Sequence, residues 1–168
     1  MNGLPRFVLD TNVFIEAARR YYAFDIAPAF WGELGRQAGT GKLLSIDRVK
    51  DELARGNDDL AQWANGQFHP YFASTADQDV LRAYGEIMRW VDQQAQLSQQ
   101  AKADFARAEN ADVWVVAYAM AKGCVVVTHE QYNPDIQRKI PIPNVCKAFG
   151  VPYVDTFEML RRLGVTFR

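Results

Sequence analysis

The stretch ADVWVVAYAMAKGCVVVTHE, residues 111–130, constrains the fold of this chain more than any other. It predicts a helix that is apolar on every side after Asp112 and that ends at Lys122 and Gly123, followed by a strand of four apolar residues, 124–127. A helix without a polar face must be buried, and an apolar strand belongs to a sheet that is covered on both faces. The chain therefore needs a central sheet enclosed by helices.

The remaining sequence alternates between short apolar runs and amphipathic helices. Further strands are expected at 7–9, 43–46, 71–74 and 151–154. Further helices are expected at 13–22, 28–37, 47–55, 58–66, 77–94, from an N-cap at Ser98, and after Asp155 in a capping-box-like start with Glu158. This alternation indicates an α/β fold with a mostly parallel sheet. Because no linker or repeat divides its 168 residues, one domain over 1–168 is expected.

Composition excludes several classes of protein. With 49% hydrophobic and 23% charged residues the chain is of ordinary globular type, and no apolar run approaches the roughly 20 residues that span a bilayer. Two cysteines, Cys124 and Cys146, are too few for a disulfide framework, so buried thiols in a reducing cytosol are expected. A net charge of −1 argues against broad non-specific binding to nucleic acid but permits a local basic rim.

Acidic side chains follow two of the buried strands. Asp10 comes directly after Leu9, and Glu130 closes the strand that contains Val127. In parallel α/β sheets, ligands bind beyond the carboxyl ends of the strands. Two helices also carry an acid near a strand edge, Glu52 and Asp112.

Four carboxylates in one place would repel one another and raise each other's pKa values. Such a cluster is understandable if a divalent cation neutralises it, and ligands that are all oxygen atoms select Mg²⁺ or Mn²⁺. Acidic clusters that hold these ions commonly act on phosphate diesters.

Each acid taken alone also has an explanation that involves no metal. These are N-capping of the first helix by Asp10 and Asn12, an ion pair of Glu52 with Arg48 or Arg55, complementarity of Asp112 to a helix dipole, and solvation of Glu130 in a loop. The combination of acids carries the argument, and no single residue decides it.

Three stretches together resemble the PIN-domain family of nucleases. They are LDTN at 9–12, a glutamate in the VKDEL helix about 40 residues later, and the block 111–130. The later IPIPNVCKAFGVPYVDTFEML, residues 140–160, is similar to a poorly characterised bacterial subgroup of PIN-like proteins. The resemblance covers nearly the whole chain and implies a three-layer α/β/α PIN-like fold.

The resemblance also implies roles for individual residues. Asp10, Glu52 and Asp112 would be catalytic acids that bind metal, with Glu130 at a fourth position where the family usually has Asp or Asn. Asn12 and Thr128 would be polar supports of that site. Arg138 and Lys139 are candidates for binding RNA phosphates, and His129 is a further candidate for contact with the substrate.

The function implied is a metal-dependent endoribonuclease that hydrolyses single-stranded RNA, using Mg²⁺ or Mn²⁺. Many compact PIN proteins are cytoplasmic toxins held inactive by a small antitoxin, and homodimers are common among them. One alternative is a degenerate PIN-like module that only binds protein or RNA, which the glutamate at position 130 keeps open. Another is a phosphatase of the haloacid-dehalogenase type, but that chemistry needs a second Asp where this chain has Asn12.

Overall fold

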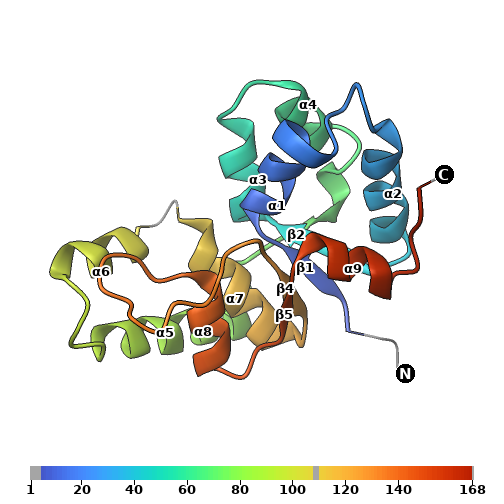
Figure 1. Ribbon diagram of the computed structural model, residues 1–168. Helices are drawn as coiled ribbons and strands as arrows, with labels where there is room; N and C mark the ends of the chain where they lie inside the picture. Colours follow the sequence, from blue (N-terminus) through green and yellow to red (C-terminus); the bar gives the residue numbers. More distant parts are fainter. Residues whose placement is uncertain (1–4, 108–109, 168) are drawn as a thin grey trace.

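Five parallel strands form the centre of the molecule in the order β3-β2-β1-β4-β5 (Figure 1). The computed structural model describes residues 5–107 and 110–167. The strands are β1 Phe7–Leu9, β2 Leu43–Ile46, β3 Phe72–Ala73, β4 Val125–Val127 and β5 Tyr153–Val154. Helices cover both faces, so the fold is the expected three-layer α/β/α arrangement.

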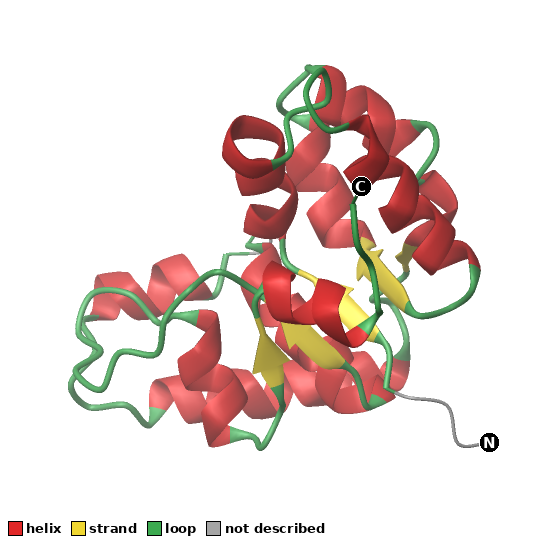
Figure 2. Cartoon of the chain, turned by 45° about the vertical axis from the view of Figure 1, so that its right-hand side comes forward, coloured by secondary structure: helices red, strands yellow, loops and turns green. Residues whose placement is uncertain are grey.

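The helices of the described residues connect these strands in order. They are α1 Thr11–Glu16, the π-helix η1 Ala17–Tyr21, α2 Pro28–Gly39, α3 Asp47–Ala54, α4 Asp59–Asn65, the 3-10 helix η2 His69–Tyr71, α5 Gln78–Asp92, α6 Gln99–Phe105, α7 Ala111–Lys122, α8 Ile142–Ala148 and α9 Thr156–Arg162. Helix α7 packs on β2, β1 and β4 from one side, whereas α9 lies in front of the strands on the other (Figures 1 and 2). No helix in the described part of the chain is long and apolar enough to cross a bilayer.

The direction in which strands are added to the sheet reverses at β1. The chain runs from β1 to β2 and β3 on one side, and then returns to add β4 and β5 on the other side of β1. Leu9 is in register with Val127, so the residues that follow β1 and β4 leave the sheet next to each other. This is the switch point at which α/β sheets bind ligands.

The block 111–130 forms the buried centre that its sequence predicts. Val115, Val116 and Ala117 of α7 are completely buried, as are Val126 and Val127 of β4. Helix α7 ends at Lys122 and is capped by Gly123, whose backbone is left-handed (φ 68°). The expected N-caps are confirmed at Ser98, which accepts a hydrogen bond from the Ala101 amide (3.0 Å), and at Asp155, which accepts one from the Glu158 amide (2.8 Å).

Three expected elements differ from the structure in detail. The helix predicted over 13–22 is instead α1 followed by a π-helical segment, in which the Tyr22 amide donates to the carbonyl of Ala17 (2.8 Å). The strands predicted at 71–74 and 151–154 are reduced to two residues each. Pro152 directly precedes β5 and has no amide hydrogen with which to extend the ladder, whereas Tyr71 belongs to the 3-10 helix η2, where its amide donates to the carbonyl of Phe68 (3.0 Å).

The left-handed turn at Gly123 predicts opposite effects for one substitution at two glycines. Gly123→Ala should lower the free energy of unfolding by about 1 kcal/mol, because a Cβ atom disfavours left-handed backbone although there is space for it. Gly85→Ala, inside α5, should raise it by about 0.5–1 kcal/mol, because alanine is the better helix former. Urea unfolding of both variants measures this, and equal effects would contradict the conformational assignment.

Candidate metal centre

Asp10 lies at the carboxyl end of β1 and is completely buried. It occupies the N-cap position of α1 with extended backbone (φ −71°, ψ 155°), yet its side chain makes no capping hydrogen bond. Oδ2 accepts a hydrogen bond from Oγ1 of Thr128 (3.1 Å), whereas Oδ1 has no partner among the described residues. Helix capping therefore does not explain this carboxylate, and one of its buried oxygen atoms lacks any hydrogen bond there.

Asp112 lies in the first turn of α7. The cap of this helix is the neighbouring Asn110, whose Oδ1 accepts a hydrogen bond from the Asp112 amide (3.0 Å). Because the Asn110 side chain caps the N-terminus of α7, the Asp112 carboxylate is not needed as a cap and can point toward the sheet. The buried body of α7 holds its first turn in a fixed place beside β1.

Glu130 reaches the same place from the loop after β4. Its backbone amide donates to Oγ1 of Thr128 (3.1 Å), and its Oε1 accepts from the amide of Ile142 at the start of α8 (2.8 Å). Its Oε2 lies 3.9 Å from Nζ of Lys139, and its side chain is only 12% exposed. Glu130 is thus a positioned residue and not a solvated loop acid.

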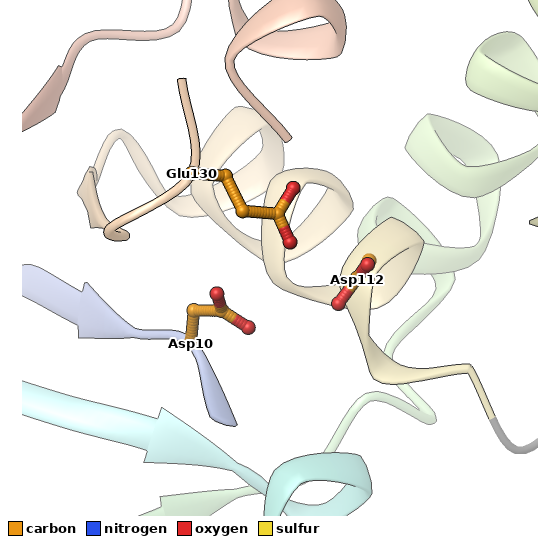
Figure 3. Close-up of side chains that lie close together, drawn as sticks. All are labelled: Asp10, Asp112 and Glu130. Carbon is orange, nitrogen blue, oxygen red and sulfur yellow. The ribbon is translucent and has the colours of Figure 1, made fainter. Parts of the chain in front are cut away.

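The three carboxylates converge. One oxygen atom from each of Asp10, Asp112 and Glu130 can be chosen so that all lie within 4.8 Å of one another. Figure 3 shows the three side chains directed toward a common space from β1, α7 and the loop after β4. Oxygen atoms at this separation can share one divalent cation, which binds carboxylate oxygens at about 2.0–2.6 Å.

Glu52 lies beside this group and not within it. Its Oε1 accepts a hydrogen bond from Oγ1 of Thr11, which connects α3 to the start of α1. Its negative charge is nevertheless close enough to contribute to the raised pKa of Asp112. The structure therefore brings Asp10, Asp112 and Glu130 together and leaves Glu52 at the edge, whereas the family resemblance ranks Glu52 with Asp10 and Asp112 and makes Glu130 the atypical position.

The pKa values of Asp10 and Asp112 are raised by burial and by the neighbouring negative charges. Burial, followed by the charges of Asp112 and Glu130, raises the pKa of Asp10 well above its ordinary value, while the Thr128 hydroxyl and the Thr11 backbone act in the opposite direction. Burial and the charges of Glu130 and Glu52 raise the pKa of Asp112 to about 7, against the opposing effect of Lys139.

The buried thiol of Cys146 lies close to the same negative charges. Burial raises the pKa of Cys146 to about 12, and the charges of Asp10 and Glu130 add to this shift. Both cysteines are buried and free, as expected from the sequence. Because the thiol stays protonated, the donors directed into the site are carboxylate oxygens, which suit a hard cation such as Mg²⁺ or Mn²⁺.

The other predicted residues occupy distinct positions around the three acids. Thr128 is buried between Asp10 and Glu130 and bonds to both. Asn12 is exposed and lines a pocket of about 490 Å³ together with Glu130. Arg138 and Lys139 line another pocket, of about 330 Å³, together with Asp112.

Two contributors to the site were not singled out from the sequence. Thr11 lies inside the LDTN motif, but nothing in the motif indicates that its hydroxyl donates a hydrogen bond to Glu52 on α3. The Ile142 amide that holds Glu130 is a backbone group, and no side-chain pattern indicates it.

Comparison with known proteins establishes the family. Residues 7–167 match the model of the family described as Domain of unknown function (DUF4411), and the chain belongs to that family. No curated protein matches it. Among solved structures, the chain is similar to one from the crystal structure of VapBC2 from Rickettsia felis bound to a DNA fragment from their promoter, with a TM-score of 0.52 and 14% identity over 89% of this chain and 97% of that one. This similarity supports the fold.

The raised pKa of Asp112 predicts how stability depends on pH without metal. Because the folded pKa of about 7 exceeds the unfolded value of about 3.9, stability should fall as pH rises between these values. Asp112→Asn removes this loss. The Tm of Asp112→Asn minus that of the wild type, measured in EDTA, should be near zero at pH 4 and should increase up to about pH 7.5. A difference that does not change with pH would contradict the carboxylate repulsion.

Proposed function

We propose that this chain is one PIN-like nuclease domain that acts as a metal-dependent endoribonuclease on single-stranded RNA. The observation that supports this best is the convergence of three acids at the switch point of the sheet, with one buried carboxylate oxygen of Asp10 lacking a partner in the described residues. Such a site is costly for the metal-free fold, and a bound cation would remove the cost.

Asp10, Asp112 and Glu130 would hold Mg²⁺ or Mn²⁺, with Glu52 as an additional catalytic acid at the edge. When bound, the cation supplies Lewis acidity toward water and phosphate oxygens, which is the chemistry that hydrolysis of a phosphodiester requires.

The remaining groups of the site would orient these acids. The Thr128 hydroxyl lies between Asp10 and Glu130 and fixes both, and the Ile142 amide holds Glu130 from the other side. Arg138 and Lys139 are exposed beside Asp112 and would bind phosphates of the RNA backbone. Asn12, exposed near Glu130, would be a polar support on the substrate side.

We further propose a cytoplasmic toxin that is inhibited by a small antitoxin protein and that forms a homodimer. The likeness in fold to VapBC2, whose crystal structure has it bound to a DNA fragment from its promoter, supports a partner protein, whereas the homodimer and the cytoplasmic location rest on the resemblance of the sequence to the PIN-domain family. The alternative is a catalytically degenerate binding module. It rests on Glu130, whose carboxylate accepts a hydrogen bond from the Ile142 amide and lies near the Lys139 ammonium group even without a metal. A haloacid-dehalogenase-type phosphatase fits less well, because Asn12 stands where that chemistry needs an acid.

Cleavage of RNA tests the proposal. The wild type, incubated with mixed single-stranded RNAs and Mn²⁺, should give fragments that end in 5′-phosphate and 3′-hydroxyl, and EDTA should abolish the reaction. Asp10→Asn and Asp112→Asn should each lower the rate by about 100-fold or more, the scale on which loss of an electrostatic stabiliser acts. Asp79→Asn is the matched control, because Asp79 is an exposed acid of α5, and this variant should cleave RNA like the wild type.

Two results would contradict the proposal. One is cleavage that persists in EDTA, and the other is equal cleavage by the wild type and both site variants, since either would place the activity outside these carboxylates. Absence of cleavage by the wild type combined with retained RNA binding would favour the degenerate module.

A further inference from the structure

We infer that the pocket beside Glu130 binds a nucleobase of the RNA strand, with Tyr21 as the stacking residue. This inference rests on the proposed nuclease function and names the part of the substrate that the site selects. It assigns Tyr21 and His129 to substrate binding.

The pocket adjoins the acidic cluster directly. It has a volume of about 490 Å³, within the range of about 300–1,000 Å³ typical of ligand sites, and is lined by Asn12, Glu16, Tyr21, His129, Glu130 and Gln131. Glu130 belongs both to this lining and to the group of three converging carboxylates. A nucleotide whose phosphate lies at the acids therefore has this pocket within reach of its base.

An aromatic ring is presented at this pocket. Tyr21 is 50% exposed, although large hydrophobic and aromatic side chains are mostly buried in this fold. Its ring packs edge-on against Phe157 (centroids 5.4 Å apart, interplanar angle 82°) and lies 6.2 Å from the ring of His129. These neighbours hold the ring in place before a ligand arrives, which lowers the entropic cost of stacking.

His129 is fixed in the same cluster. Its Nε2 lies 2.8 Å from Oγ1 of the buried Thr156, and its ring packs against Phe157 (6.0 Å). Phe157 at the start of α9 thus contacts both the ring of Tyr21 from η1 and the ring of His129 from the loop after β4. Residues far apart in sequence meet here, as expected for a built site.

The exposed Tyr21 stands at the end of a π-helical segment. Tyr21 is the last residue of η1, and the neighbouring Tyr22 stacks on Phe30 in the interior (4.3 Å, interplanar angle 6°). The hydrogen bond from the Tyr22 amide to the Ala17 carbonyl is of the i→i+5 type, so this turn holds one more residue than a turn of α-helix. Because each residue of a regular α-helix is rotated by about 100°, the extra residue changes the direction of the side chains that follow it. Such π segments are frequent at functional sites.

The charges around the acids favour a base in this pocket and a phosphate in the other. Glu16, which pairs with the exposed Arg20, and Glu130 line the pocket of Tyr21. Arg138 and Lys139 line the pocket on the Asp112 side. A neutral planar base avoids the repulsion that a phosphate would meet from Glu16 and Glu130. Only an unpaired base can stack on a side chain, so this pocket selects single strands.

Binding of a short RNA tests the inference independently of cleavage. Ca²⁺ replaces Mn²⁺ as a carboxylate-binding cation, fluorescence anisotropy measures Kd for a labelled single-stranded octanucleotide, and a gel checks that the RNA stays intact. Tyr21→Leu should weaken binding about tenfold, the effect of losing one stacked base, whereas Tyr21→Phe should bind like the wild type. Tyr132→Leu is the matched control, because Tyr132 is similarly exposed (42%) but faces Lys147 and lies outside the pocket lining.

An abasic nucleotide walked along the octamer completes the test. At one position the abasic nucleotide should weaken binding to the wild type as much as Tyr21→Leu does. At that position it should not weaken binding to Tyr21→Leu any further, since both changes remove the same contact. Losses that multiply at every position, or unchanged binding by Tyr21→Leu, would overturn the inference. In that case Mn²⁺-dependent cleavage by the wild type would leave the nuclease proposal intact. If the two binding losses are coupled but the wild type cleaves no RNA, the base pocket is supported and the nuclease proposal is contradicted.

Discussion

Repulsion between closely placed carboxylates, of which Asp10 is buried, is the constraint on which the arrangement of this protein depends. Asp10 is enclosed at the end of the central strand, and Asp112 and Glu130 are directed at it from two other elements. A fold can hold such charges together only if the surrounding structure is rigid. Here the supports are the wholly apolar α7, the apolar strand β4, and the hydrogen bonds of Thr128 and Ile142.

The switch point of the sheet determines what surrounds these acids. Because β1 and β4 end side by side, the loop after β4 passes over Asp10 and carries Glu130 and His129 with it. Asp112 borders a pocket with basic residues, and Glu130 borders one with an exposed aromatic ring. On the proposed function, the acids would stand between a surface for phosphates and a surface for a base, and this would give a bound RNA strand a direction across the site.

The parts predicted from sequence are those governed by hydrophobic pattern. The all-apolar helix and strand of 111–130 required a covered parallel sheet, and acids after two strands had to meet at its carboxyl edge. The sequence could not separate Glu52 from the other acids, because one hydroxyl contact from Thr11 decides its position. Nor could it indicate the π-helical turn at Ala17–Tyr21, since the helical period through that segment looks regular.

Direct titration of Mn²⁺ is the measurement closest to the central claim that these carboxylates form a divalent metal site. Electron paramagnetic resonance detects free Mn²⁺, so bound ion is counted as lost signal. The wild type should bind at least one Mn²⁺, and Asp10→Asn should bind far more weakly, because it replaces the buried carboxylate that has an oxygen without a partner in the described residues. Undiminished free signal with the wild type, or equal binding by Asp10→Asn, would contradict the account.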